Sequence, residues 1–432
     1  MSVEGFYLYN NKYYYCSSTN TLINSDLKDI YSKYRKNQEI HVDAVKVDAD
    51  SVKSNLVSLK QLTFEITQSC NLNCAYCVYE SGNYVHFRSG STKSLEFETA
   101  KRSIDQIWQL IKERDKKEFT IGFYGGEPLI YFPVIKKIAD YSTKTFYKWK
   151  LSFSITTNST LLTDEIINYF IEKDFFILIS LDGPKENHDA KRVYRNGKGS
   201  YSSAIESLGK IRRINNEYYS EKVSFSIVYS KDLSFKKMFH FFNNEPLVKN
   251  NNLKLAFVTE TDSTYYEKNP FEATKFKKDF GEIFQAILRK KKERKGLSSL
   301  ESDIATTFDI FSKQLGKSHF NSLMGTCFYS TRLYVDADGG FHICEKMNDS
   351  FQFGSVDKGF DFQKMAALTN GYQEVLKKCH QCEVKYLCQK CYVNFAKGGN
   401  VEISKEFCTN AKYNIKKMFE DVIRFEEGET AE

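Results

Sequence analysis

The chain has 432 residues, of which 41% are hydrophobic and 27% charged, and its formal net charge is +7. This composition is typical of a folded protein of two or three domains and excludes a disordered or fibrous chain. The basic residues are dispersed, and their densest run, at 289–295, ends a predicted helix. A solvated helix end is therefore favoured there over a nucleic-acid interface.

The amino terminus lacks the basic and apolar segments of a secretory signal. The longest apolar run, at 175–181, is far too short to span a membrane. We therefore expect a cytoplasmic protein with no membrane partner. Because thiols stay reduced in that compartment, eleven cysteines at short spacings indicate metal ligation rather than disulfides.

Short segments rich in β-branched and aromatic residues alternate with helical patterns in the middle of the chain. These strand-like segments lie at 62–67, 119–124, 151–156, 175–181, 223–228 and 253–258. Joined by right-handed helical crossovers, they predict an α/β fold, a partial parallel (β/α)6 barrel that is shorter than a full TIM barrel. In such a barrel the chemistry gathers at the carboxyl ends of the strands.

Three domains are expected from this pattern. Residues 1–60 contain short aromatic strands followed by a helix at 27–36, and form a small amino-terminal sheet-plus-helix module. Residues 61–316 hold the barrel and helices at 272–315. Residues 317–432 are rich in cysteine and loops, and end in a closing helix at 411–425.

The first cysteine group follows the first predicted barrel strand. Cys70, Cys74 and Cys77 form the motif CNLNCAYC on a single loop. Three thiolates so close together can ligate three irons of a cubane cluster and leave the fourth iron open to a cofactor. Zinc is less favoured, because a structural zinc site usually needs four ligands and no fourth cysteine lies nearby.

The spacing C-x3-C-x-aromatic-C, with Tyr76 as the aromatic residue, resembles the signature of the radical SAM superfamily. In that family the open iron chelates the amino and carboxylate groups of S-adenosylmethionine (SAM). The resemblance covers the whole predicted barrel. It implies that Gly125, Gly126, Glu127 and Pro128, after the second strand, form the segment that binds the amino group of SAM. Two glycines would let the backbone approach a ligand closely.

Polar residues also end the third and fourth strands. Asn158 follows one and Ser180 ends the other, and such groups suit a ribose. The resemblance implies that Ser180 and Arg192 contact SAM, with Arg192 forming a bidentate pair with its carboxylate. Ser180 taken alone would be an ordinary strand-end hydroxyl.

A second array of cysteines fills the last third of the chain. Its members are Cys327, Cys344, Cys379, Cys382, Cys388, Cys391 and Cys408. The array resembles the SPASM extension of radical SAM peptide and protein maturases, in which seven cysteines hold two auxiliary 4Fe-4S clusters. The resemblance thus implies three 4Fe-4S clusters in all. Two CxxC pairs in isolation would also suit a zinc ribbon.

Matched in order to the SPASM extension, the cysteines fall into two ligand sets that the resemblance implies. The distal set is Cys379, Cys382, Cys388 and Cys408, and the proximal set is Cys327, Cys344 and Cys391. The spacing between Cys388 and Cys391 is one residue shorter than in the family. Because two cubanes need eight ligands, one proximal position is left to a substrate thiol or to another residue such as Cys16, Asp338 or His342.

Together these features predict an enzyme that forms a crosslink, a Cys thioether, in a ribosomally made precursor peptide. Residues 1–60 would dock its leader, and a flavodoxin- or ferredoxin-type donor would supply electrons. C–C or C–N crosslinking stays open. So does an anaerobic sulfatase-maturating activity, in which Glu345 would stand where that family has its aspartate base. A zinc-dependent nucleic-acid-binding protein is a remote alternative, since no partner nucleic acid is expected.

Overall fold

The computed structural model describes residues 5–29, 46–79, 82–84, 92–260, 263–316, 329, 331–389, 391–397 and 399–428. Cys327 and most of the helix predicted at 27–36 lie outside the described residues.

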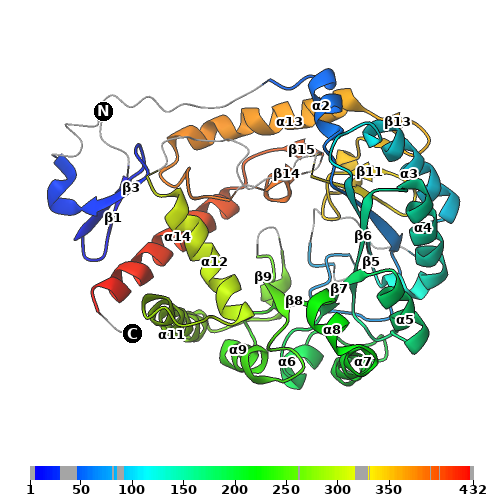
Figure 1. Ribbon diagram of the computed structural model, residues 1–432. Helices are drawn as coiled ribbons and strands as arrows, with labels where there is room; N and C mark the ends of the chain where they lie inside the picture. The colour runs from blue at the N-terminus through cyan, green and yellow to red at the C-terminus, as the bar shows by residue number, and fades with distance from the viewer. Residues whose placement is uncertain are drawn as a thin grey trace.

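The predicted strands form the centre of the molecule (Figure 1). They are β4 (Gln61–Thr67), β5 (Glu118–Gly125), β6 (Lys150–Thr157), β7 (Phe175–Ser180), β8 (Val223–Tyr229) and β9 (Asn252–Phe257). Each is parallel to the next along the chain. The predicted α/β fold with a partial parallel barrel is therefore confirmed.

The sheet also extends into the cysteine-rich part of the chain. Strand β10 (Arg332–Val335) pairs in parallel with β4, and β11 (Phe341–His342) pairs antiparallel with β10. The sheet thus has eight strands in the order β11-β10-β4-β5-β6-β7-β8-β9. The segment that carries Cys344 is consequently attached to the barrel by backbone hydrogen bonds, which the sequence pattern does not reveal.

One face of the barrel strands is apolar and the other is largely polar. Phe64, Phe123, Ile155, Ile179 and Phe225 are buried in the core beneath the helices. Those helices are α3 (Phe97–Ile111), α4 (Phe132–Thr145), α5 (Asp164–Glu172), α6 (Lys185–Asp189), α7 (Tyr201–Ile214), α8 (Asn216–Lys222) and α9 (Phe235–Asn244). The opposite face carries Thr63, Glu65, Tyr124, Ser154, Thr156, Ser180 and Ser226, together with the apolar Phe176, Leu178 and Val228. Because parallel sheets usually bury apolar residues on both faces, this polar inner face is expected to serve a ligand.

The amino-terminal strands form a separate antiparallel sheet. They are β1 (Gly5–Leu8), β2 (Tyr13–Cys16) and β3 (Thr21–Asn24). Phe6 and Tyr15 pack their rings against Phe419 of α14 (Lys405–Glu426). The small sheet lies beside α14, on the side of the molecule away from β4 and β5 (Figure 1).

Long helices join the barrel to the chain ends. They are α11 (Ala273–Lys292), α12 (Ser299–Gln314), α13 (Phe362–Leu376) and α14, with α2 (Ala49–Leu56) beside α13. The predicted helical region 272–315 is confirmed. The closing helix begins before its predicted start, because the Ser404 side chain caps it by accepting from the backbone N–H of Phe407.

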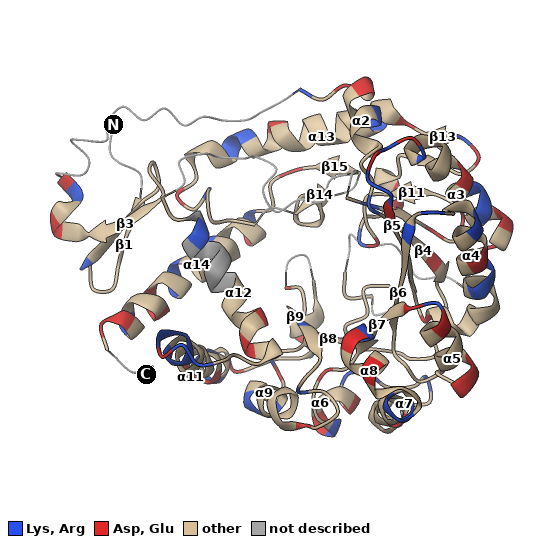
Figure 2. Ribbon diagram, viewed as in Figure 1, with Lys and Arg blue, Asp and Glu red and all other residues tan. Residues whose placement is uncertain are grey.

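The remaining elements are short. They are α10 (Tyr265–Lys268), η1 (Ser25–Leu27), η2 (Pro128–Tyr131), η3 (Asp349–Phe351), η4 (Lys377–Gln381), η5 (Tyr392–Asn394), β12 (Gly354–Ser355), β13 (Gly359–Phe360), β14 (Ala396–Lys397) and β15 (Asn400–Val401). In the described part of the chain, no helix combines the length and apolar character needed to cross a membrane. Basic and acidic residues are mixed along the helices, with a basic end on α11 (Figure 2).

Candidate active site

The first cysteine group lies at the carboxyl edge of the barrel, as predicted. Cys70, Cys74 and Cys77 occupy the loop that follows β4. The backbone N–H of Asn73 donates to Val193 O at 2.7 Å, and that of Ala75 donates to Lys191 O at 2.9 Å. The loop is therefore held by the segment after α6 through bonds that need no metal.

The chemistry of these thiols fits a bound metal cluster. Burial raises the pKa of Cys74 to about 12, and the neighbouring Cys77 and Cys70 raise it too, while Arg192 opposes them. Several thiolates cannot share this buried loop unless a cation compensates their charge. The predicted iron-sulfur cluster would supply that cation and would be held by Cys70, Cys74 and Cys77.

The two glycines after β5 allow a close approach, but to the cysteine loop itself. A Cβ on Gly125, whose φ is +138°, would lie 2.2 Å from Thr67 O, and one on Gly126 would lie 2.2 Å from Ser69 O. The N–H of Gly126 donates to Thr67 O, and the N–H of Glu127 donates to Ser69 O. These glycines thus fix the start of the cysteine loop against the end of β5.

Glu127 is buried and held by three protein donors. It is 1% exposed and begins η2, whose first residue is Pro128. Its carboxylate accepts from Leu129 N at 3.1 Å, from Thr157 Oγ1 at 2.7 Å and from Asn158 N at 2.7 Å. Burial raises the pKa of this carboxyl to about 7, although the hydrogen bonds oppose the shift. Glu127 therefore ties β5 to β6, and its contact with the amino group of SAM remains a prediction.

Asn158 and Ser180 lie at the same edge of the sheet. Asn158 Nδ2 donates to Asn71 Oδ1 at 2.8 Å and lies 3.9 Å from the Sγ of Cys70. Ser180 ends β7, where it is half-buried on the inner face opposite Ser226. The fold therefore brings Asn158 directly beside the cysteine loop.

Asp182, which we did not predict as a site residue, connects Tyr76 with Arg192. It is 1% exposed, and its Oδ2 accepts from Arg192 Nε at 2.8 Å and from the Tyr76 hydroxyl. Its Oδ1 accepts from Val228 N at 3.0 Å. The Arg192 guanidinium also lies over the Tyr76 ring, 5.3 Å from its centroid. The pairing with Asp182 orients Arg192, whose contact with SAM remains a prediction.

A buried histidine supports this arrangement. The Asp182 N–H donates to His188 Nδ1 at 3.3 Å, and His188 Nε2 lies 2.9 Å from Ser200 Oγ. Ser200 Oγ in turn donates to Arg192 O at 2.8 Å. Burial lowers the pKa of His188 to about 4, so the ring is neutral near pH 7 and acts as a positioning group.

Glu345 lies near the inner face of the barrel, directly after Cys344. Its carboxylate is 3.8 Å from an Arg332 terminal nitrogen, and its backbone oxygen accepts from the Tyr79 hydroxyl at 3.4 Å. Tyr79 comes two residues after Cys77. The segment carrying Glu345 and the first cysteine loop are thus neighbours, and the role of Glu345 as a base remains a prediction.

Five of the later cysteines gather near α13 and α14. Cys408, at the start of α14, interacts electrostatically with Cys382. The phenol of Tyr372 in α13 interacts electrostatically with Cys391, Cys379 and Cys388. The predicted distal ligands therefore lie in one region, with Cys391 close to them. Since Cys327 is outside the described residues, the proximal set remains a prediction.

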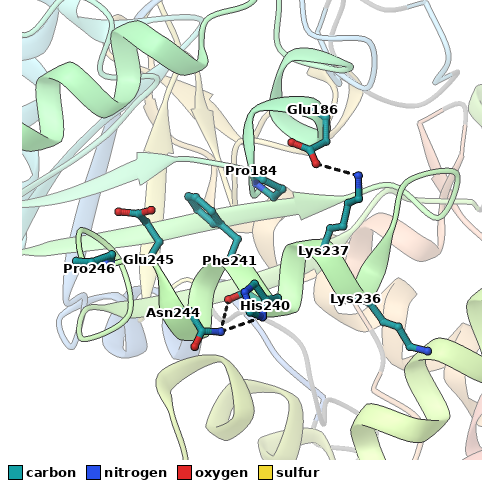
Figure 3. A pocket seen from close by; sticks show the side chains of 9 residues that line it. All are labelled: Pro184, Glu186, Lys236, Lys237, His240, Phe241, Asn244, Glu245 and Pro246. Atoms are coloured by element: carbon teal, nitrogen blue, oxygen red, sulfur yellow. Dashed lines mark hydrogen bonds and ion pairs between the residues drawn. The ribbon is translucent and has the colours of Figure 1, made fainter.

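A surface groove lies apart from this site. Its volume is about 490 Å³, and it runs between α6 and α9 on the outside of the barrel (Figure 3). Both of its lysines are paired, Lys237 with Glu186 at 2.9 Å and Lys236 with Glu282 at 2.7 Å. None of its lining residues belongs to the predicted SAM site.

Comparisons with known proteins bear on the function. Residues 64–240 match the Radical SAM superfamily. An uncharacterized protein of Methanocaldococcus jannaschii is 34% identical over 157 residues, which are 36% of this chain and 50% of that protein. A radical SAM cyclopropyl synthase of Paramaledivibacter caminithermalis is 29% identical over 192 residues, or 43% of this chain and 38% of the synthase. The chain thus spans half or less of these two relatives.

A third relative matches over most of its length. It is a cysteine-type anaerobic sulfatase-maturating enzyme of Clostridium novyi, 26% identical over 388 residues, or 83% of this chain and 95% of the enzyme. A solved structure of native anSMEcpe with bound AdoMet and a peptide superposes with a TM-score of 0.62 at 18% identity, and covers 85% of this chain and 98% of that chain. At this identity the superposition shows a shared fold. The family match therefore assigns a radical SAM domain to residues 64–240 of this chain.

Proposed function

We propose that this enzyme modifies a peptide or protein segment, and that its product is a crosslink, a Cys thioether, in a ribosomally made precursor. The observation that carries the proposal is the largely polar inner face of the barrel, beside which the Cys344–Glu345 segment is held by contacts of Glu345 with Arg332 and Tyr79. A peptide backbone needs such hydrogen-bonding groups, whereas an apolar substrate does not.

Relatives support a peptide substrate. The matching anSMEcpe structure contains a bound peptide, and the sulfatase-maturating relative covers most of this chain. The bound SAM and its cluster would supply a radical able to remove a hydrogen atom from an unactivated carbon. The chain's own residues would orient that cofactor through Arg192 and Asp182, and keep water away from it behind Tyr76.

The cysteine-rich segment favours a crosslink that needs further oxidation. Forming a thioether from a C–H and an S–H bond removes two hydrogen atoms in all. One leaves with the radical, and the other leaves as a proton and an electron. Glu345 is suited to accept the proton, and two auxiliary 4Fe-4S clusters bound by the later cysteines would accept the electron. A flavodoxin- or ferredoxin-type protein would supply the electron that starts each turnover.

Formylglycine formation is the second candidate. The sulfatase-maturating relative, matched over 95% of its length, favours it. Glu345 would then deprotonate the substrate side chain as it is oxidised to an aldehyde, and no crosslink would form. C–C and C–N crosslinks are weaker candidates, since the structure offers nothing that prefers them over a C–S bond.

The amino-terminal sheet would dock the leader of the precursor. Its edge strands, β1 and β3, each pair with β2 on one side. Addition of a peptide strand to such an edge is a common recognition mode. Since the sheet packs on α14 through Phe6 and Tyr15, a leader bound there would lie near the later cysteines rather than over the barrel.

The products can be distinguished by mass spectrometry. Anaerobically reconstituted enzyme is incubated with SAM, a reductant and cysteine-containing peptides, including those bound in the anSMEcpe structures. A thioether shows loss of two hydrogen atoms and of the free thiol, whereas formylglycine shows loss of sulfur and reacts with a hydrazide. We expect the first outcome with a precursor peptide. An aldehyde would favour the second candidate, and a Cys→Ser peptide that is still crosslinked would exclude the thioether.

A further inference from the structure

Two tyrosines lie side by side on the inner face of the barrel, and only one of them has its hydroxyl engaged by the described protein. Tyr334 of β10 is fully buried and donates to Glu65 Oε1 at 3.1 Å. Tyr124 of β5 is half-buried, with its ring 6.5 Å from that of Tyr334. Among the described residues, no side chain or backbone group hydrogen-bonds its hydroxyl.

Tyr124 lies close to three parts of the site, namely β4, the first cysteine loop and the Cys344–Glu345 segment. It pairs in register with Glu65 on β4 and directly precedes Gly125, which fixes the cysteine loop. Burial raises the pKa of Tyr124, and the next contributions come from Glu345 and Cys77. The neutral phenol therefore lies between the first cysteine loop and the Cys344–Glu345 segment.

The side chain is held in place by its neighbours. Its ring meets Tyr334 edge to face at 71°, and Tyr334 is anchored by Glu65. Glu65 also accepts from Ala337 N at 3.0 Å and from Gln68 Nε2 at 2.9 Å. A partly buried phenol fixed in this way normally has a hydrogen-bond partner, and on an inner face built for a ligand that partner is the ligand.

We propose that Tyr124 is a substrate-binding residue whose hydroxyl donates a hydrogen bond to a backbone carbonyl of the peptide beside the reacting residue. The inference rests on the proposed peptide-modifying function and adds the residue that aligns the substrate. A phenol suits this role because it donates without carrying charge and is not readily deprotonated when buried. It holds the reacting carbon between the cofactor side of the barrel and Glu345.

The test is a Tyr124→Phe variant, which removes the hydroxyl and keeps the ring. Its matched control is Tyr141→Phe, because the Tyr141 hydroxyl binds Asp105 on the outer helices, away from the inner face. The probes are cysteine-containing peptides that the wild-type enzyme binds, deuterated at the carbon atoms of every residue, so that hydrogen abstraction from any of them is detected. Peptide affinity is measured by calorimetry on SAM-loaded enzyme, and deuterium transfer into 5'-deoxyadenosine by mass spectrometry.

We expect Tyr124→Phe to weaken peptide binding about fivefold, as loss of one neutral hydrogen bond does. More 5'-deoxyadenosine should form without deuterium, while iron content and SAM affinity stay at wild-type values. Tyr141→Phe should match the wild type throughout. Equal peptide affinity and equal deuterium transfer in Tyr124→Phe would overturn this inference and leave the proposed function standing. Wild-type enzyme that binds no peptide would overturn both.

Discussion

The barrel and the cysteine-rich segment build their sites in different ways. In the barrel, the predicted SAM site stands on strand ends above a continuous apolar core, and Asp182 and Glu127 are each held by three hydrogen-bond donors. In the cysteine-rich segment, Cys379 lies in the short helix η4, and Cys382 and Cys388 flank a turn at 383–387. The barrel site is therefore fixed by the protein itself, whereas we expect the cysteine-rich segment to depend on the predicted auxiliary clusters.

The two regions differ in how far their conformation is expected to depend on a bound metal. The backbone N–H groups of Asn73 and Ala75 bind the first cysteine loop to a neighbouring segment, so we expect the loop to keep its conformation without a metal. The later cysteines are surrounded by few long elements, apart from α13 and α14. Where regular structure is scarce, metal binding contributes folding free energy directly.

The largest effect is expected from replacing Cys70, Cys74 and Cys77 by Ala. SAM cleavage should fall by about a thousandfold or more, because no open iron would remain to bind SAM. About four irons should be lost, while the thermal midpoint of the barrel changes little. Iron assay, product chromatography and calorimetry check these outcomes. Continued formation of 5'-deoxyadenosine would contradict the assignment of this loop.

A Cys379→Ala and Cys382→Ala double variant should have a mostly structural effect. We expect the region from η4 to the start of α14 to lose several kcal/mol of local stability, because its metal would no longer bind. Hydrogen exchange should accelerate there and stay slow in β4 to β8, where the core is continuous. Uncoupled SAM cleavage should persist. Equal loss of protection in both regions would show that they fold as one unit.

Sequence alone predicts the barrel well for a physical reason. Its strands are short apolar runs separated by helices of clear periodicity, and parallel pairing then follows from the crossover rule. Motif spacing also places Cys70 and Gly126 just after predicted strands, because each motif and its strand are neighbours in the sequence. The structure adds that Ser69 O leaves no room for a Cβ on Gly126.

What the sequence does not reveal depends on distant contacts. Asp182 carries no motif of its own, and its importance arises from Arg192 and Tyr76, which reach it from other loops. Pairing of β10 with β4 joins residues far apart along the chain, and a four-residue strand has too weak a pattern to predict it. Likewise, the sequence gives no sign that His188 is buried, because its local pattern is that of an ordinary loop residue.

Glu127 offers a pH-dependent test of the protein-built site. Its pKa is raised from 4.5 to about 7, so the folded state holds a proton that the unfolded state releases in this range. The protein should therefore lose up to about 3 kcal/mol of stability from this group as pH rises from about 4.5 to 7, and no more above that. In Glu127→Gln this part of the slope should vanish, although the mismatched amide lowers overall stability. Unfolding midpoints at several pH values check it, and an unchanged slope would contradict the assignment.

The smallest expected effect comes from Asp182→Asn, which tests whether the barrel site acts through orientation. The amide can still accept from Val228 N, but its nitrogen would face two donors, the Arg192 Nε and the Tyr76 hydroxyl. Arg192 would then lose its fixed orientation, and SAM affinity should fall about tenfold, or about 1.4 kcal/mol. Iron content should stay constant because no ligand of the cluster changes.

The matched control is Asp174→Asn, which breaks the exposed pair with Lys222 outside the site and should leave SAM affinity unaltered. Calorimetric titration of SAM measures both variants. Equal affinity in Asp182→Asn and wild type would mean that Arg192 is positioned by its ring contact with Tyr76, whereas loss of iron with affinity would show that the cysteine loop depends on Asp182 after all.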